Sequence, residues 1–311
     1  MALLTWRVGD ITISRLVEMA GDGPGGGEHS PLPEAYPETL KRLSWLIPDF
    51  VTEEGYMRFS VHALLVDTPD GRLIVDTCVG NDKTRAMPMW NKLTTSFLED
   101  LKAHGWRREA VDGVLCTHLH VDHVGWNTML DGETWAPTFP NARYYMARAE
   151  VEHWRGEMAK EREARAPETG ARSLMESEAT FLDSVKPILD AGLDEQVETD
   201  AIIMPGVRLM PTPGHTPGHV SVILESKGER AVITGDLMHH PCQIAHPHWS
   251  SVFDTDAELS MSSRLSFFAE FADTGTLVIG THFGGPTAGH ITRHGEEFRF
   301  AASSAGFETT A

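Results

Sequence analysis

Cysteine is scarce in this chain, and its few cysteines form no motif. The 311 residues contain Cys78, Cys116 and Cys242, an odd number with no C-x-x-C spacing. This usage argues against a disulfide framework and favours a reducing compartment. We therefore predict a cytoplasmic protein with buried thiols. Cys116, in an apolar strand two residues before a histidine, is expected to pack in the core.

Positive charge and long apolar runs are also lacking. Lysine and arginine number 26 against 45 aspartates and glutamates, which gives a net charge of −19. Binding to phosphates needs a basic surface, so this charge argues against a nucleic-acid partner. No apolar run approaches the roughly 18 residues that span a bilayer, and the N-terminus lacks the pattern of a signal peptide. We therefore expect neither nucleic acid nor membrane among the partners.

Strand and helix patterns alternate along the chain without a break of the kind a linker makes. This favours an α/β fold in which 1–311 form one domain. Alternating apolar residues at 6–18 and 59–76 predict strands, and the sequence at 69–71 predicts a hairpin turn within the second stretch. A Gly/Pro-rich segment at about 20–37 is expected to form a surface loop and a candidate flap.

Helical patterns follow in the middle of the chain. Residues 91–104 place Leu93, Phe97 and Leu101 on one face of a predicted helix. Residues of about 147–192 are helical in pattern and heavily charged, and Pro167 and Gly170 interrupt them. We expect a helical insertion with a solvated face.

A later helix is predicted over 256–273. Thr255 and Glu258 have the spacing of a capping box at its start. The apolar stripe of this helix is expected to consist of Met261, Leu265, Phe268 and Ala272.

The segment THLHVDHVG concentrates metal-binding side chains. In an extended chain, residues i and i+2 point the same way, so His118 and His120 should face one side together. Asp122 and His123 follow at the turn into a helix expected to start near Val124. Imidazole and carboxylate groups arranged in this way can bracket two cations and suit zinc and similar divalent metals. The alternative is a polar loop with a helix cap at Asp122, which leaves three histidines without a purpose.

Further metal ligands are available at later strand ends. His215 lies in a tight Pro/Gly turn, Asp236 follows an apolar strand behind a glycine, and His282 follows another apolar strand. His219 competes with His215, but it opens the next strand and is expected to be structural. Each residue alone is a weak signal, whereas their joint occurrence after the first cluster is a stronger one.

With these motifs, nearly the whole chain resembles the metallo-β-lactamase-fold metallohydrolases. The resemblance implies a four-layer αββα sandwich with the site at the edge between the two sheets. It also implies that His118, His120 and His215 bind one metal, and that Asp122, His123 and His282 bind the second. Asp236 would bridge the two metals.

Two positions bear on the branch within this family. The common dinuclear β-lactamases have a cysteine near the position of Asp236, so the aspartate resembles the lactonase and hydrolase branches. The best-known acyl-homoserine lactonases have a tyrosine three residues after the bridging aspartate, where this chain has His239. That residue and the FDTD segment before the 256–273 helix are more similar to methyl parathion hydrolase.

The resemblance implies hydrolysis by a hydroxide shared between two divalent metals, most simply Zn²⁺, with Mn, Fe or Co as alternatives. Asp122 and Asp236 are expected to bind metal first and to shuttle a proton second. His239 is either a donor to the developing oxyanion or a surface histidine beside His240.

An apolar pocket wall is expected near the metals, which suits a small uncharged ester or lactone. The candidate wall residues are Met89, Trp90, Trp126, Trp249 and Phe283. The nearest alternative is an organophosphate triester hydrolase with the same site. A thioesterase, a redox member of the family and a non-enzymatic binding protein are less favoured. A homodimer is compatible with the sequence.

Overall fold

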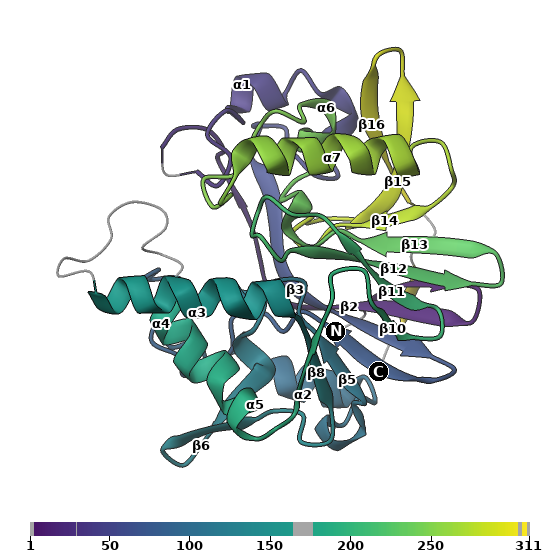
Figure 1. Cartoon of the computed structure of the whole chain (residues 1–311). Helices are drawn as coiled ribbons and strands as arrows, with labels where there is room; N and C mark the ends of the chain where they lie inside the picture. The colour runs from purple at the N-terminus through teal and green to yellow at the C-terminus, as the bar shows by residue number, and fades with distance from the viewer. Residues whose placement is uncertain (1–2, 29, 164–176, 304–306, 310–311) are drawn as a thin grey trace.

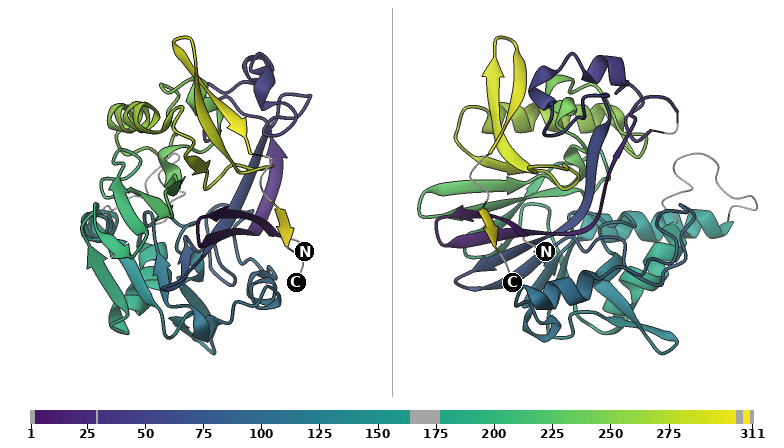
Figure 2. Two further views of the ribbon diagram at one scale, coloured as in Figure 1. Left: turned by 90° about the vertical axis from the view of Figure 1, so that its right-hand side faces the viewer. Right: turned by 180° about the vertical axis from the view of Figure 1, so that it is seen from behind.

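Two β-sheets face each other in the protein, with helices on both outer sides (Figures 1 and 2). The computed structural model describes residues 3–28, 30–163, 177–303 and 307–309. Among these residues, no helix combines the length and apolar character needed to cross a membrane.

The first sheet has the strand order β17-β1-β2-β3-β4-β5-β8-β9. The bounds of its strands are β1 Leu3–Val8, β2 Ile11–Gly23, β3 Met57–Thr68, β4 Gly71–Val75, β5 Gly113–Leu115, β8 Arg143–Ala147, β9 Asp194–Val197 and β17 Phe307–Thr309. Because β1 pairs with β17, the first and last strands lie side by side (Figure 2).

The second sheet has the order β10-β11-β12-β13-β14-β15-β16, and β6 and β7 form a separate hairpin. The bounds are β6 Thr128–Asp131, β7 Thr134–Pro137, β10 Ile202–Met204, β11 Val207–Pro211, β12 Val220–Ser226, β13 Glu229–Ile233, β14 Leu277–Ile279, β15 Ala288–His294 and β16 Glu297–Ala302. The α-helices are α1 Pro37–Leu40, α2 Phe97–Ala103, α3 Arg148–Glu163, α4 Ser177–Thr180, α5 Lys186–Asp190, α6 Cys242–Ala245 and α7 Ala257–Phe271.

Three clusters of buried side chains define four layers. One cluster joins apolar residues of both sheets, such as Leu64 and Val222, and forms the layer between them. A second packs the outer face of the first sheet against α2, α3 and α5. A third packs the outer face of the second sheet against α6 and α7. The αββα sandwich expected from the sequence is thereby confirmed.

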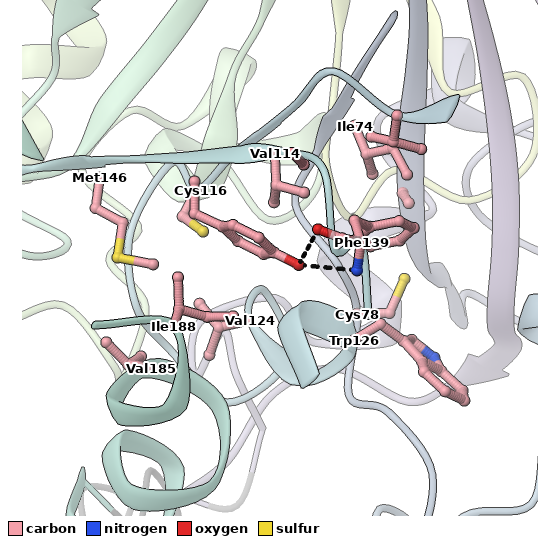
Figure 3. Packing of buried hydrophobic residues seen from close by; sticks show 14 of the residues in the cluster. Ile74, Cys78, Val114, Cys116, Val124, Trp126, Phe139, Met146, Val185 and Ile188 are labelled. Atoms are coloured by element: carbon pink, nitrogen blue, oxygen red, sulfur yellow. Dashed lines mark hydrogen bonds between the residues drawn. The ribbon is translucent and has the colours of Figure 1, made fainter. Parts of the chain in front are cut away.

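The cysteines and the predicted hairpin agree with the sequence analysis. Cys78, Cys116 and Cys242 are buried free thiols, and Cys116 packs in the cluster around Met146 and Ile188 (Figure 3). Strands β3 and β4 are antiparallel and pair Thr68 with Gly71 across a two-residue turn.

The Gly/Pro-rich segment is shorter and better packed than the sequence suggested. Strand β2 continues to Gly23, and Leu32 and Ala35 are fully buried in the cluster beneath α7. This segment and α1 cover the same outer side of the sandwich as α6 (Figure 1). Leu32 and Ala35 thus anchor a segment that is otherwise partly exposed, and its role as a flap stays a prediction.

The helix predicted over 91–104 is confirmed only from Phe97 onward. Leu93 forms a β-bridge with Asn81 instead. The Asn81 side chain donates to the Thr95 carbonyl (2.9 Å) and accepts from the Thr95 N–H (2.7 Å). These two bonds hold the chain extended, so that the helix begins after Ser96.

The predicted insertion over 147–192 is helical where the structure describes it. It comprises α3, α4, a π-helical turn η5 at Phe181–Val185, and α5. Pro167 and Gly170 lie outside the described residues. The face of the insertion is only partly solvated, because Trp154, Val185 and Ile188 belong to a buried cluster.

The start and the buried face of α7 also differ from the prediction. Asp256, rather than Thr255, caps the helix by accepting from the Leu259 N–H (3.0 Å). Leu265 is 42% exposed, whereas Arg264 is fully buried. Phe268 and Ala272 of the predicted stripe are buried, so the prediction fails mainly at Leu265. Arg264 is buried in addition, because its guanidinium donates to the carbonyls of Pro247 and Leu237 and to Ser260 Oγ.

Candidate functional site

The carboxyl ends of parallel strands bring the predicted ligands to one edge of the sandwich. Strand β4 is parallel to β5, and β13 is parallel to β14. The THLHVDHVG segment follows β5, Asp236 follows β13 and His282 follows β14. His215 lies in the loop between β11 and β12. Carboxyl ends of parallel strands are where open sheets commonly bind ligands.

The α-helix expected near Val124 is absent, and a single 3₁₀ turn (η3, Gly125–Asn127) leads directly into β6. The Gly125 N–H donates to the Cys78 carbonyl (2.7 Å), in the loop after β4. A Cβ atom at Gly125 would lie 1.8 Å from the Val79 carbonyl oxygen. This close approach fixes the end of the ligand segment against the loop after β4.

Four side chains form a first ligand group, and all are buried. The group consists of His118, His120, His215 and Asp236, whose ligand atoms lie within 4.8 Å of one another. His120 Nδ1 lies 2.9 Å from His118 Nε2 and 2.8 Å from His215 Nε2. Three ring nitrogens therefore converge on one point, as ligands of a single cation do.

Asp122, His123 and His282 form a second buried group, with ligand atoms again within 4.8 Å of one another. The Nε2 atoms of His123 and His282 are 3.2 Å apart. Asp236 lies between the groups. Its Oδ2 is 3.4 Å from His215 Nε2 and 3.3 Å from His123 Nε2, and its Oδ1 is 3.2 Å from His282 Nε2.

The residues present fit a pair of bound cations. Asp236 Oδ1 is buried and makes no hydrogen bond, an arrangement that is costly unless a positive partner is supplied. The ring nitrogens that point into the site face one another. The acceptors that these nitrogens meet are the carboxylates of Asp122 and Asp236. Imidazole and carboxylate donors of this kind suit zinc and related divalent metals.

The outward ring nitrogens are held by acceptors, which orients the rings. His215 Nδ1 lies 2.9 Å from Asp254 Oδ1, and His123 Nδ1 lies 2.9 Å from Asp76 Oδ2. His282 Nδ1 lies 3.1 Å from the Ser60 carbonyl oxygen. Each outward N–H donates, so the inward nitrogen keeps a lone pair for a metal.

Burial and charge shift the pKa values in the metal-free site. Burial and the neighbouring histidines hold the pKa of His118 well below its usual range, so that this ring is neutral. Burial alone would raise the pKa of Asp236, but His123, His282 and His239 outweigh it and keep this pKa well below normal. Burial would lower the pKa of His123, but Asp236, Asp122 and Asp76 raise it well above normal.

His239 lies at the site and His240 does not. The His239 ring stacks on His282 at 5.8 Å, and its Nε2 lies 3.2 Å from Asp236 Oδ2 without a hydrogen bond of good geometry. His240 points away, with Nε2 lying 3.0 Å from the Phe50 carbonyl oxygen. The surface-histidine alternative for His239 is thus wrong, since the residue is 5% exposed.

His219 has the structural role that its place at the start of a strand predicted. Its Nε2 accepts a hydrogen bond from the Asp236 N–H (2.8 Å). Neither the contact of Asp76 with His123 nor the pairing of Asp254 with His215 was predicted from the sequence. Asp76 has the same signal as Asp236, a carboxylate directly after an apolar strand.

Two of the expected pocket-wall residues are core residues instead. Trp126 stacks on Phe97 at 5.5 Å and its indole N–H donates to Glu18 Oε1 (2.7 Å); Figure 3 shows it among buried apolar side chains. Phe283 is fully buried and packs against Phe50.

The other three wall candidates differ in how deeply they are buried. Trp249 is 6% exposed and stacks on His246, Trp90 packs partly against a buried cluster, and Met89 is 63% exposed. An aromatic side chain that does contact a ligand is Trp154, which meets the His120 ring at 5.2 Å.

A cavity of about 990 Å³ lies away from the ligand groups. It is lined by β1, by the turn between β12 and β13, and by the turn between α7 and β14, including Trp6, Arg230 and Thr276. None of the seven metal-binding side chains lines this cavity. The site is therefore identified by the clustering of those side chains and not by the size of a cavity.

Comparison with known proteins agrees with this geometry. The chain is 26% identical over 218 residues to an N-acyl homoserine lactonase of a Bacillus species, which covers 66% of this chain and 74% of the relative. Its fold matches the crystal structure of the hydrolase AbOPH of the beta lactamase superfamily, with a TM-score of 0.77, 26% identity and 97% of each chain covered.

The dizinc quorum-quenching lactonase AidC has the same fold, with a TM-score of 0.76, 20% identity and 97% of each chain covered. Residues 56–282 match the metallo-beta-lactamase superfamily. This match spans most of the chain and includes all seven ligand positions, and the protein is therefore a metal-dependent hydrolase of the metallo-beta-lactamase superfamily.

Proposed function

We propose that the protein is a dinuclear metal hydrolase that opens a lactone or cleaves a carboxylic ester. The observation that carries this proposal is the Asp236 carboxylate, which lies 3.4 Å from His215 of the first ligand group and 3.2–3.3 Å from His282 and His123 of the second. Two divalent cations, most simply Zn²⁺, would lower the pKa of a water molecule between them and polarise the substrate oxygen.

The chain's own residues divide this work. His118, His120 and His215 would hold the first metal, Asp122, His123 and His282 would hold the second, and Asp236 would contribute to both. Asp122 and Asp236 are also placed to pass a proton to the leaving group. Because Asp122 is the most exposed of the ligands at 9%, together with His282 at 8%, the substrate approaches from their side.

His239 is proposed as the donor to the oxyanion. Burial lowers the pKa of His239, so the ring is neutral near pH 7 and can donate from one nitrogen. Neither of its ring nitrogens is used in a hydrogen bond, and the ring lies beside Asp236 and His282.

The lactone preference is supported by the relatives, two of which are described as lactonases. An organophosphate triester hydrolase is the second candidate, because the same site can attack a phosphoryl centre. Asp254 of the FDTD segment favours it, since this segment is similar to methyl parathion hydrolase and Asp254 contacts the ligand His215. A single domain over 1–311, a homodimer and a cytoplasmic location stay predictions.

The test is metal analysis combined with a substrate screen. Protein purified without chelator is expected to contain two transition metals per chain. It should hydrolyse lactones or aryl esters in a chelator-sensitive manner, with marginal turnover of β-lactams. A firm stoichiometry of one metal would contradict the dinuclear site. Rapid β-lactam hydrolysis with no activity on esters and lactones would contradict the substrate class, and faster phosphotriester turnover would favour the second candidate.

A further inference from the structure

Glu150 is a buried carboxylate on α3 that accepts four hydrogen bonds. It is 1% exposed and lies in the first turn of the helix. Its Oε1 accepts from the Leu119 N–H (3.1 Å) and the Trp154 indole N–H (2.6 Å). Its Oε2 accepts from the Thr216 hydroxyl (2.8 Å) and the Gly218 N–H (3.1 Å).

Three of these donors belong to the two loops that carry the histidines of the first ligand group, and the fourth, Trp154, lies on α3 itself. Leu119 lies between His118 and His120, and Thr216 directly follows His215. One loop follows a strand of the first sheet and the other joins two strands of the second sheet. Each oxygen of the Glu150 carboxylate therefore holds a different loop, and the carboxylate links the two sheets at the site.

We propose that Glu150 is a positioning residue that sets the distance between the His120 and His215 rings and so shapes the first metal site. This inference rests on the two-metal function proposed above. Glu150 makes no hydrogen bond to the ligand rings themselves, only to the loops beside them and to Trp154. By holding both loops it sets the distance between His120 Nδ1 and His215 Nε2, which is 2.8 Å.

The surrounding packing leaves little freedom for this arrangement to change. A Cβ atom at Gly218 would lie 2.4 Å from the Glu150 backbone nitrogen, so the loop is pressed against the start of α3. The Trp154 indole, which Glu150 holds, packs against His120 at 5.2 Å. Both contacts transmit the position of Glu150 to the ligands.

The number of donors explains why a carboxylate is needed. An ionised carboxylate has about four acceptor sites, whereas the single amide oxygen of glutamine has two, and the glutamine NH₂ group is itself a donor. The Thr216 hydroxyl can rotate to accept from that group, but the Leu119 and Gly218 N–H groups cannot. Glu150→Gln therefore keeps the size of the side chain and breaks the hold on one loop.

The experiment compares Glu150→Gln with Glu152→Gln, an exposed glutamate on the same helix. Zinc affinity is measured at both sites by chelator competition, and the visible spectrum of the cobalt-loaded protein reports ligand geometry. Loss of a residue that orients metal ligands typically costs 10–100-fold in affinity. Glu150→Gln is expected to lose that much at one site, to alter the cobalt spectrum and to leave the other site nearly unchanged. Glu152→Gln should match the wild type.

Equal affinities and identical spectra for Glu150→Gln and the wild type would overturn the positioning role. If Glu150→Gln does not fold, Thr216→Val removes one donor and leaves the carboxylate in place. A weaker zinc affinity at one site in Thr216→Val supports the role, and an unchanged affinity overturns it. Failure of the wild type to bind two metals would instead contradict the proposed function.

Discussion

Asp236 differs from the other ligands because its two oxygens face both ligand groups. It lies within 3.4 Å of His215 in the first group and of His123 and His282 in the second. Its backbone N–H donates to His219 Nε2, which holds the main chain of Asp236 in place beside the two groups. The charge on this one side chain therefore affects both sites.

Asp236→Asn is expected to weaken both metals at once and to lower kcat by at least 10²-fold. An amide offers one neutral acceptor oxygen, and its NH₂ group cannot bind a metal. Metal stoichiometry after dialysis and steady-state kinetics measure the effect. His215→Ala is the comparison, because it should empty mainly the first site. Full activity and two metals in Asp236→Asn would show that the carboxylate does not bridge.

His239→Ala is expected to lower kcat by about 10²-fold and to leave both metals bound. This is the usual cost of removing one preorganised donor to an oxyanion. The exposed His248→Ala serves as the control and should retain wild-type kinetics. His240→Ala is a poor control, because this buried ring lies 3.0 Å from the Phe50 carbonyl oxygen and its loss would lower stability. Unchanged kinetics in His239→Ala would exclude the donor role.

Local spacing explains which site residues could be predicted. His118, His120, Asp122 and His123 are neighbours in sequence, so the direction of their side chains follows from strand geometry. The partners of Glu150 could not be predicted in this way. It lies in a charged helical segment whose polar residues usually face water, and three of its four donors come from loops that lie 31 to 68 residues away.

At the scale of elements, tertiary hydrogen bonds decided where helices start and which face is buried. Asn81 holds the residues before α2 extended, and Gly125 gives its N–H to the loop after β4. In α7, the hydrogen-bonded Arg264 is buried and Leu265 is exposed. Hydrophobic periodicity predicts the existence of such elements but carries no information on partners distant in sequence.

The helical insertion is tied to the rest of the protein by a buried lysine. Lys83 Nζ lies 3.5 Å from Asp183 Oδ1 of η5, 2.8 Å from Thr128 Oγ1 and 3.8 Å from the centre of the Trp135 ring. Arg85 makes two further bonds to the same aspartate (2.7 and 2.9 Å). Burial, which Asp183 only partly offsets, lowers the pKa of Lys83 to about 7.

Lys83→Met is expected to remove a pH dependence of stability. Between about pH 7 and the usual lysine pKa of 10.5, the unfolded chain holds a proton that folded Lys83 has lost. The contribution of Lys83 to the unfolding free energy therefore rises with pH in this window and falls as pH drops toward 7. Methionine cannot titrate, and Arg85 still pairs with Asp183.

Urea unfolding of both proteins at pH 7 and pH 9 measures this effect. The stability of the wild type relative to Lys83→Met should increase by on the order of 2 kcal/mol from the lower pH to the higher. A difference that stays constant between the two pH values would mean that the lysine keeps its proton in the folded protein.

At the scale of the whole molecule, the site joins the two halves of the sandwich. The THLHVDHVG segment extends from the first sheet, while His215, Asp236 and His282 extend from the second. Away from the site, the sheets are held together by apolar packing such as that of Leu64 and Val222. Cations bound at this edge would therefore link both halves and bind the folded state alone.

Removing the metals is accordingly expected to lower the thermal stability of the entire protein in one transition. A ligand present at 1,000 times its Kd stabilises the folded state by about 4 kcal/mol. For a domain of this size that corresponds to a decrease in Tm of roughly 6 °C for each metal. Differential scanning calorimetry before and after chelation, followed by addition of zinc, measures the change and its reversal. Asp236→Asn should show a smaller decrease, because it begins with weaker sites. If chelation removed both metals by elemental analysis and left Tm unchanged, the cations would not link the two sheets.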